Sequence, residues 1–491
     1  MTAATIAATS ASADHSFFGH PRGLSTLFFT EMWERFSYYG MRALLILFMT
    51  APAAAGGLGF DTAVAGAIYG LYTSSVYMAC LPGGWIADRL IGARRAVLYG
   101  GILIAAGHFS MAVQALPAFY LGLTLIVLGT GLLKGNVAVI VGQLYAKDDQ
   151  RRDAGFSIFY MGINLGAFIA PLICGYLGQR VNWHIGFGAA GVGMTLGLIQ
   201  YVLGARNLGD AGVLPAQSLS PAGRRVTAIV VAAALLFAAA LFTGIIPITA
   251  KQIADTAGIL LIGGAIAFFT WLFLSPGWTT VERRRLAAIL LLFIAACLFW
   301  SEFEQAGSTL NLFGDRATRT SILGWSFPSS YYQSLQPLFI ITFAPVFAWL
   351  WIWLGPREPS SPTKFSFGLL CVGSGFAVIA VAAVFGANGV KVSPMWLVVT
   401  YLLHTWGELA LSPVGMSAMT KLAPARIGGL IMGVWYLSIS IGNFTGGRIS
   451  TLYGSMSLPT LFGVVAAAGI LGGVVMTLLA RPIKNLMGGV N

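Results

Sequence analysis

Long apolar runs follow one another along the chain and are separated by short polar segments. Runs of roughly 20 apolar residues predict membrane-spanning helices, because a helix satisfies its own backbone hydrogen bonds in lipid. The runs lie at 24–50, 62–86, 95–115, 118–142, 155–179, 184–204, 226–248, 254–274, 286–313, 330–354, 364–387, 395–420, 427–450 and 458–480. This pattern predicts an all-α membrane protein with fourteen helices.

Polar residues interrupt the first apolar run at helical spacing. They are Glu31, Glu34, Arg35, Tyr38, Tyr39 and Arg42. Spacings of three and four residues put most of these side chains on one face of a helix. Ionisable groups at bilayer depth are costly and persist mainly where they pair, line a water-filled cavity or move protons. We interpret this face as one wall of a polar cavity.

The composition agrees with this class: 57% of residues are hydrophobic, 9% are charged and the mean hydropathy is +0.81. Basic residues gather in every second loop, which predicts that both termini face the cytoplasm. The net charge of +12 mostly reflects this bias, so we expect no nucleic-acid partner. The N-terminal segment lacks the pattern of a cleaved signal, and we expect the first helix to be retained.

The four cysteines fall within predicted helices and have no metal-ligand spacing. They are Cys80, Cys174, Cys297 and Cys371. We expect them to pack as apolar residues, with no metal site. The sequence carries no hydrolase, zinc-protease or nucleotide-binding motif in a suitable context, and its loops are short. A membrane enzyme or receptor is therefore a remote alternative.

Buried charge is concentrated in the first, fourth, seventh and tenth helices once the 226–274 hairpin is set aside. The groups are Glu31, Glu34, Arg35, Arg42, Lys134, Glu302, Glu304 and Glu408. From the helical rise, Arg42 and Glu304 lie at similar depth and could pair across a cavity. Lys134, Glu34 and Glu408 form a second group nearer the cytoplasm. Charge pairs at two depths suit a transporter whose gates open when a glutamate is protonated, although purely structural bridges remain an alternative.

Glu302 and Glu304 are two residues apart, so only one can face a cavity squarely on a regular helix. We favour Glu304, which shares a face with Trp300, and expect Glu302 to face a neighbouring helix. In the tenth helix, His404, Glu408 and Ser412 form a polar stripe at one-turn spacing. His404 could tune Glu408, but a packed histidine with a single hydrogen bond is the simpler interpretation.

Two six-helix halves account for twelve of the fourteen helices. The remaining pair lies between them, and we interpret it as a peripheral hairpin without transport chemistry, with Asp255 at its turn. The predicted parts are a cytoplasmic tail at 1–23, a bundle at 24–205, a linker with the hairpin at 206–284, a bundle at 285–481 and a tail at 482–491. The loop GGWIADRLIGARR at 83–95 can make charge-assisted bonds to helix ends.

That loop is similar to the signature of the major facilitator superfamily, and further motifs narrow the match. Glu31-Met32-Trp33-Glu34-Arg35-Phe36 resembles the ExxERF motif of the proton-dependent oligopeptide transporters, a branch of that superfamily. Four more segments resemble the same family in order: GTGLLKGN at 129–136, FYMGINLGAFIAP at 159–171, FWSEFEQAGS at 299–308 and GELALSPVG at 407–415. The resemblance implies a major facilitator fold of two six-helix bundles, with the extra hairpin of bacterial members.

The resemblance implies a symporter that imports di- and tripeptides with protons by alternating access, in the cell inner membrane and without a cofactor. The implied proton-coupling residues are Glu31, Glu34, Arg35, Lys134 and Glu304. Arg42 and Lys134 would bind the peptide carboxylate, and Glu408 with Asn164 the amino group. The other implied substrate-binding residues are Tyr39, Tyr77, Trp300, Glu304, Gln336, Ser412 and Trp435. Since the implied site lies within one chain, a monomer in the bilayer suffices.

Charge supports a peptide substrate, because basic residues on one wall and a glutamate on the other match the two ends of a zwitterion. A family member that carries nitrate or another small metabolite is the alternative, although a lone anion would not need Glu408. Three positions depart from the family. Gly135 replaces a proline, Gln336 replaces an asparagine, and Gly70 replaces the histidine of animal members.

Overall fold

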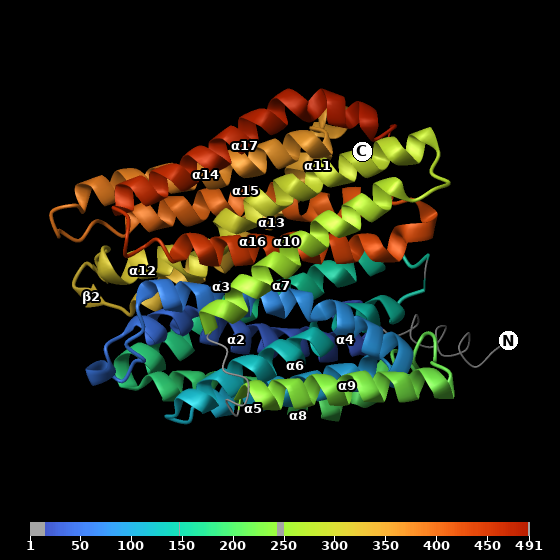
Figure 1. Ribbon diagram of the computed structural model, residues 1–491, viewed down its shortest axis with the longest axis horizontal. Helices are drawn as coiled ribbons and strands as arrows, with labels where there is room; N and C mark the ends of the chain where they lie inside the picture. The colour runs from blue at the N-terminus through green and yellow to red at the C-terminus, as the bar shows by residue number, and fades with distance from the viewer. Residues whose placement is uncertain (1–14, 147, 243–249, 490–491) are drawn as a thin grey trace. The chain divides into compact units, whose positions relative to one another are not determined.

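The computed structural model describes residues 15–146, 148–242 and 250–489. Helices make up most of the described residues (Figure 1), which confirms the all-helical fold class. Among the described residues, nine helices are long and apolar enough to cross a membrane. The first helix is not one of them, because Glu31, Glu34, Arg35 and Arg42 interrupt its apolar run.

The helices begin and end close to the predicted boundaries. Their bounds are α2 (Arg22–Thr50), α3 (Thr62–Met78), α4 (Cys80–Ile86), α5 (Ala93–Met111), α6 (Leu116–Gln143), α7 (Arg152–Tyr176), α8 (Trp183–Gly204), α9 (Pro221–Phe242), α10 (Ala250–Leu274), α11 (Thr280–Phe303), α12 (Thr309–Arg316), α13 (Leu335–Leu354), α14 (Ser361–Phe385), α15 (Met395–Leu422), α16 (Gly428–Ser450) and α17 (Leu458–Leu486). Two short strands, β1 (Ser321–Ile322) and β2 (Trp325–Ser326), pair antiparallel with Ser321 opposite Ser326.

Short turns of other helical types join several of these helices. The π-helical turns are η2 (Ala87–Ile91) and η3 (Leu177–Val181). The 3-10 turns are η1 (Ala53–Ala55), η4 (Ala205–Leu208), η5 (Glu304–Gly307), η6 (Ser329–Ser334), η7 (Gly355–Arg357) and η8 (Ala425–Ile427). The second predicted span is therefore not one regular helix, since α3, α4 and η2 follow one another along it.

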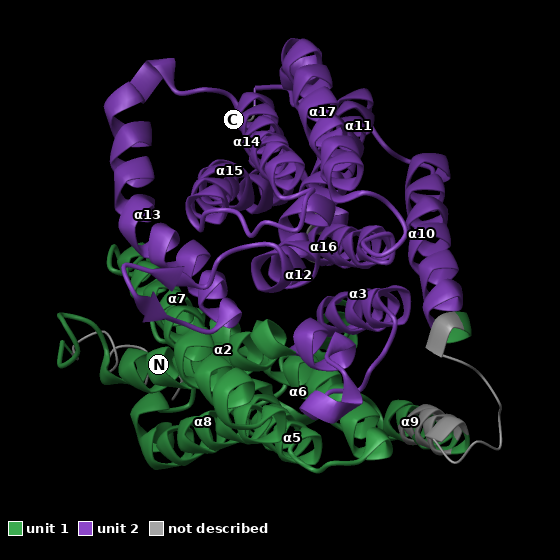
Figure 2. Cartoon of the chain, turned by 90° about the vertical axis from the view of Figure 1, so that its left-hand side faces the viewer, with its two compact units in different colours: residues 1–44, 78–253 green, residues 45–77, 254–491 purple. Residues whose placement is uncertain are grey.

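Backbone contacts divide the chain into two compact units (Figure 2). Unit 1 comprises residues 1–44 and 78–253, and unit 2 comprises residues 45–77 and 254–491. The second helix thus groups with unit 2, where a Cβ on Gly447 of α16 would lie 2.2 Å from the Cα of Gly70 on α3. The predicted bundles at 24–205 and 285–481 have other boundaries than these two units. They stay predictions.

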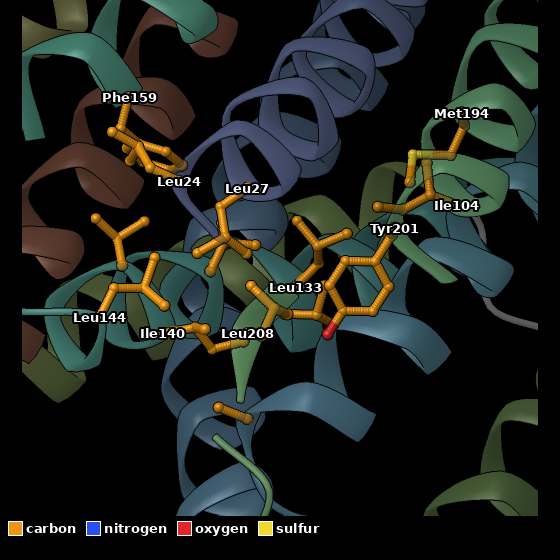
Figure 3. Packing of buried hydrophobic residues seen from close by; sticks show 14 of the residues in the cluster. Leu24, Leu27, Ile104, Leu133, Ile140, Leu144, Phe159, Met194, Tyr201 and Leu208 are labelled. Carbon is orange, nitrogen blue, oxygen red and sulfur yellow. The ribbon is translucent and has the colours of Figure 1, made fainter. Parts of the chain in front are cut away.

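Unit 1 has an apolar core formed by five helices (Figure 3). Its fully buried side chains include Leu27 of α2, Leu133 and Ile140 of α6, and Met194 of α8. Ile104 of α5 and Phe159 of α7 complete the contact. Because lipid is as apolar as leucine, such helices associate mainly through close packing.

Glycines bring α5 and α6 into that close packing. A Cβ at Gly129 would lie 2.5 Å from the carbonyl oxygen of Gly100, and one at Gly122 would lie 2.6 Å from that of Gly107. The two glycines of α5 are seven residues apart, and so are the two glycines of α6. The two backbones therefore meet at two places, separated by two helical turns. Gly135, farther along α6, has nothing within 4 Å of its Cβ position.

The 83–95 loop makes the bonds to helix ends that its charges predict. The guanidinium of Arg94 donates to the carbonyl oxygens of Ala205 and Gly209, at 2.9 and 2.7 Å, where α8 ends. The linker returns to the same loop, because the amides of Gln217 and Leu219 donate to the carbonyls of Asp88 and Arg89. Arg94 thus satisfies carbonyls that the end of a helix leaves without partners.

The prediction that Asp255 lies at the hairpin turn is wrong. Asp255 lies within α10, which begins at Ala250, and forms an ion pair with Arg448 of α16. Gly258, one turn further, allows contact with Phe444, because a Cβ there would lie 2.4 Å from the ring. At the other end of α10, Arg426 stacks on Trp278, 3.2 Å from the ring centroid. Within unit 2, α10 is therefore held against α16 near Asp255, while the contact between Arg426 and Trp278 joins η8 to the segment that follows α10.

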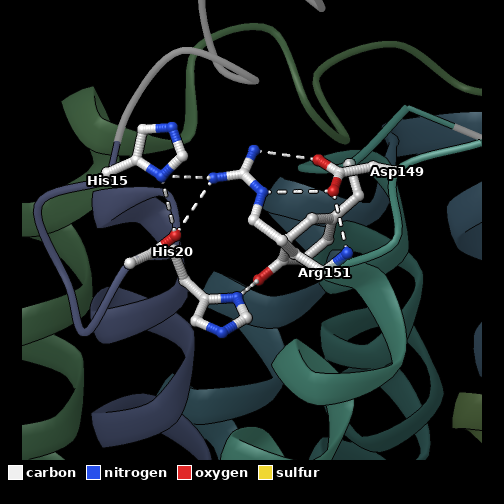
Figure 4. A network of polar contacts seen from close by, with 6 residues as sticks. His15, His20, Asp149 and Arg151 are labelled. Atoms are coloured by element: carbon white, nitrogen blue, oxygen red, sulfur yellow. Dashed lines mark hydrogen bonds and ion pairs between the residues drawn. The ribbon is translucent and has the colours of Figure 1, made fainter.

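A polar network ties the chain before α2 to the segment after α6 (Figure 4). His20 Nδ1 lies 3.0 Å from the hydroxyl of Tyr145, and Arg151 donates to the carbonyl of Gly19 at 3.0 Å. Arg151 also pairs with Asp149 at 2.9 Å. Burial lowers the pKa of His20, as does the charge of Arg151, while Asp149 raises it in part.

We predict that Gly129→Ala destabilises the protein, whereas Gly135→Ala on the same helix does not. The new methyl group at 129 meets backbone, which cannot change rotamer, and such overpacking costs about 1–3 kcal/mol. At 135 the methyl group meets nothing, and alanine is a better helix former than glycine. Thermal unfolding in detergent, followed by tryptophan fluorescence, measures the difference. Equal melting temperatures for the two variants would contradict the packing described for α5 and α6.

We also predict that the 15–20 segment loosens in acid. The folded-state pKa of His20 lies below its unfolded value of about 6.5, so the folded form binds fewer protons. Stability from neutral His20 is fully present above that pH and is lost as the pH falls below it. Hydrogen exchange at residues 15–20, corrected for intrinsic rates, should accelerate from about pH 7.5 to about pH 5.5. His20→Asn should remove this acceleration, and its persistence in the variant would exclude His20 as the cause.

Candidate functional site

Unit 1 places three charged side chains of α2 in one buried cluster. The Arg35 guanidinium bonds both carboxylate oxygens of Glu34, through Nη2 to Oε1 at 2.7 Å and through Nε to Oε2. Arg35 Nε also lies 3.4 Å from Glu31 Oε1. All three residues are at most 3% exposed. Pairing and hydrogen bonds lower the cost of buried charge, so the cluster explains how this helix carries these three side chains.

Tyr38 and Lys134 lie beside this cluster, and other candidate residues of unit 1 have contacts of their own. Arg35 lies 5.2 Å from the ring centroid of Tyr38, and Arg42 lies 5.6 Å from that of Tyr39. Lys134 of α6 is close enough to Glu31 for a favourable Coulomb interaction with its carboxylate. The Asn164 amide donates to the carbonyl of Tyr160, one turn earlier on α7, at 2.9 Å. Arg42 and Asn164 are both 4% exposed.

The seventh helix breaks at its acidic motif, whereas the sequence predicts one helix over 286–313. The α-helix α11 ends at Phe303, the 3-10 turn η5 covers 304–307, and α12 begins at Thr309. Glu304 therefore lies outside the regular helix on which its predicted orientation relied. Glu302 remains in α11, is 1% exposed and lies against Gly469 of α17, where a Cβ would lie 2.3 Å from its carboxylate. The expectation that Glu302 faces a neighbouring helix is confirmed.

Side chains from η6 and α15 donate hydrogen bonds to a backbone carbonyl at this break. Gln333 Nε2 donates to the carbonyl of Ala306 at 2.6 Å and to the Tyr401 hydroxyl at 3.0 Å. The Tyr401 hydroxyl reaches the same carbonyl at 3.4 Å. Gln305 fastens its own turn by donating to Ser301 O and accepting from the Thr309 hydroxyl. Sequence reasoning assigned no role to Gln333 or Tyr401, although Gln333 lies only three residues before Gln336.

Gln336 and Glu408 come together in unit 2. Gln336 Nε2, in the first turn of α13, donates to Glu408 Oε2 of α15 at 2.8 Å. The Gln336 side-chain amide therefore fixes one carboxylate oxygen of Glu408. The glutamine that replaces the family's asparagine thus reaches Glu408 directly. Ser412 lies one turn after Glu408 on α15 and is half-buried. His404 is 1% exposed and packs between the rings of Phe303 and Phe376.

The predicted aromatic residues of unit 2 form two pairs. Trp300 of α11 meets Trp435 of α16 edge to face, with ring centroids 6.4 Å apart. The ring centroid of Tyr77 of α3 lies 6.5 Å from that of Tyr436 of α16. Gly442 permits the approach of α16 to α11, because a Cβ there would lie 2.4 Å from the Cβ of Trp300.

The candidate residues thus form a group in each unit. Unit 1 holds Glu31, Glu34, Arg35, Tyr39, Arg42, Lys134 and Asn164, and unit 2 holds Tyr77, Trp300, Glu304, Gln336, Glu408, Ser412 and Trp435. The predicted pair of Arg42 with Glu304 joins the two units and stays a prediction. None of the four cysteines forms a disulfide within the described residues, and Cys80, Cys174 and Cys371 are buried.

Two departures from the family have a structural account. A Cβ at Gly70 would lie 2.7 Å from the Cα of Gly447, so the backbone of α16 occupies the place of a side chain there. At Gly135, α6 continues as one regular helix from Leu116 to Gln143. The missing proline therefore leaves this helix unbroken beside Lys134.

A helical bundle with paired charges inside its spans defines a polytopic membrane protein of the transporter class. The family model described as "POT family" matches residues 94–464. The chain is 44% identical to "Peptide transporter YePEPT" of Yersinia enterocolitica subsp. palearctica, covering 98% of each chain. It is 38% identical to "Di-/tripeptide transporter" of Lactococcus lactis subsp. cremoris, covering 97% of this chain and 98% of that one.

Solved structures agree with the sequence comparisons. A crystal structure of the peptide transporter POT in complex with sulfate superposes with a TM-score of 0.95 at 44% identity, covering 100% of both chains. The chain belongs to the POT family of membrane transporters and has its major facilitator fold. These matches point to a transporter family rather than to an enzyme family.

We predict that Gln333→Ala destabilises the η5 turn more than Tyr401→Phe does. The first change leaves the buried Ala306 carbonyl with only a 3.4 Å contact, and a lost partner of this kind costs about 1–3 kcal/mol. The second removes the 3.4 Å bond to that carbonyl and the 3.0 Å bond that Gln333 donates to the hydroxyl, but it keeps the 2.6 Å bond from Gln333 to the carbonyl. Thermal unfolding of the two purified variants tests the order. A larger loss for Tyr401→Phe would show that Gln333 is not the main support of the break.

Proposed function

We propose that the protein is a proton-coupled symporter that imports di- and tripeptides by alternating access. The observation that carries the proposal is the buried Glu31–Arg35–Glu34 cluster in a chain of the POT family. The relatives named as peptide and di-/tripeptide transporters support the substrate class. We further propose that the proton gradient drives transport without a cofactor or enzymatic step, and that one chain, with both termini in the cytoplasm, suffices.

The cluster on α2 suits proton binding because two carboxylates share one guanidinium. With both glutamates ionised the cluster carries one net negative charge, and one proton neutralises it. Protonation of Glu31 removes only the 3.4 Å contact and leaves the two bonds between Arg35 and Glu34 in place. Glu31 Oε2 accepts no hydrogen bond from the described residues, so a proton can bind there without displacing a donor. Protonation of Glu31 also weakens the attraction between its carboxylate and Lys134, which favours an anionic substrate group beside Lys134.

Charged side chains of the candidate groups suit the two ends of a peptide. We assign the carboxylate to Arg42 and Lys134 of unit 1, since basic side chains bind carboxylates with charge-assisted bonds. We assign the ammonium group to Glu408 of unit 2, which Gln336 orients. Every peptide has these two ends, whereas the Trp300–Trp435 and Tyr77–Tyr436 pairs supply apolar contact that suits many side chains. A substrate that is a lone anion would leave Glu408 without a role.

Uptake of labelled dialanine into proteoliposomes with an inward proton gradient tests this function. We expect accumulation that a protonophore abolishes. Accumulation that the protonophore leaves unchanged would exclude proton coupling, and absence of dialanine uptake with intact uptake of another solute would exclude the substrate class. Glu304→Gln and Lys134→Ala should each abolish the accumulation, because they remove ionisable groups that we assign to coupling.

We predict that Gln336→Leu raises the KM for dialanine by about tenfold, because Glu408 loses the hydrogen bond that orients it. Gln336→Asn should lie between the wild type and Gln336→Leu. N-acetyl-dialanine, which has no ammonium group, should inhibit the wild type and Gln336→Leu equally weakly in a competition assay. A large difference for the acetylated peptide would mean that Gln336 acts elsewhere than at the amino end.

A further inference from the structure

A groove of about 730 Å³ opens on unit 1, away from the charged face of α2. It is bordered mainly by α8, with contributions from α2, α7 and the end of α5. Its volume lies within the range of pockets that enclose small ligands. The groove is separate from the candidate site, because none of its lining residues has been assigned a role in transport.

One end of the groove is polar and structurally fixed. Gln114, Asn182 and His184 border this end. Asn182 accepts the His184 amide at 2.9 Å, as an N-cap of α8, and His184 Nδ1 lies 2.9 Å from the carbonyl of Met111. These residues lie where α8 begins and α5 has ended, which is the level of the membrane interface for spans of this length. The lining contains amides and an imidazole but no carboxylate, so this end suits an anionic or ester group.

The rest of the groove is apolar and follows α8 into the membrane. Ile185, Val192 and Leu196 recur along the helix and are 49, 52 and 45% exposed. Between them lie Gly188 and Ala189, whose small size makes the hollow. From Asn182 to Leu196 the helix rises about 20 Å, which spans the interface and the roughly 15 Å hydrocarbon depth of one leaflet.

We propose that this groove binds one acyl chain of a glycerophospholipid, with the headgroup at Gln114, Asn182 and His184. An apolar groove at bilayer depth meets hydrocarbon, and an unfilled groove would forfeit the dispersion contacts of its lining. The match of groove length to one leaflet selects a chain anchored at the interface. On the orientation predicted from the basic loops, the lipid comes from the outer leaflet.

The bound chain would touch the helix that carries the charged cluster. Trp33 and Phe36 of α2 line the groove, and their neighbours Glu34 and Arg35 point into the ion cluster. Phe36 packs on Gly193 of α8, where a Cβ would lie 2.4 Å from its ring. The lipid therefore completes the apolar support on the far side of α2 from its charges.

Native mass spectrometry of the full chain, released from detergent after purification with added phosphatidylglycerol, tests the proposal. We expect the wild type to retain one phosphatidylglycerol. Gly188→Leu should reduce retention by about tenfold, the loss expected when about two methylene groups of the chain lose their burial. The substitution is tolerated, because the nearest atom to its Cβ is Ala112 Cβ at 3.6 Å. Gly264→Leu on α10, where nothing lies within 4 Å, is the control and should retain the lipid.

A second pair of variants guards against misfolding. Val192→Ser lies in the groove and Ile199→Ser lies outside it on the same helix, and both positions are 52% exposed. Only Val192→Ser should lower retention and the thermal stabilisation that phosphatidylglycerol gives. Equal retention in both serine variants, a wild type that releases no lipid, bound detergent in its place, or a second copy of the chain instead of lipid would each overturn the proposal.

Discussion

The cost of placing charge in hydrocarbon is the constraint on which this structure depends. A partner lowers the cost of an ionisable side chain at bilayer depth, and α2 provides one internally, since Arg35 bonds Glu34 and contacts Glu31 one turn away. In unit 2 the carboxylate of Glu408 takes its hydrogen bond from Gln336 instead. One proton or one charged group of a substrate can rearrange each of these interactions. The hydrogen bonds that lower the cost of charge in lipid therefore also let the helices respond to protons and substrate.

Much of the fold could be predicted from the sequence because lipid imposes simple rules. Apolar runs gave the helices nearly to their observed ends, and the spacing of Glu31, Glu34 and Arg35 identified their shared face. The bonds from Arg94 to the end of α8 also follow from the charges of its loop. For the candidate site, motif resemblance supplied the residues, and the structure adds the hydrogen bond between Gln336 and Glu408, which the resemblance did not specify.

The remaining features depend on contacts between distant segments, which periodicity does not reveal. The break after Phe303 is held by Gln333 and Tyr401, so the run 286–313 looks like a continuous helix until its partners are known. The position of Asp255 within α10 depends on Arg448, which follows it by 193 residues. Close backbone contacts at Gly129 and Gly447 require the partner helix to be known. The groove along α8 likewise arises from four segments, and no single stretch of sequence shows it.

The central claim is that buried charge on α2 links proton movement to peptide movement. Its most direct test measures the proton flux into liposomes that contain the protein when dialanine is added outside. The pH is at first equal on both sides, and a trapped dye reports the pH of the lumen. The account predicts that the lumen acidifies when dialanine is added, and that Glu31→Gln greatly reduces this acidification. Dialanine entry without any acidification in the wild type would contradict it.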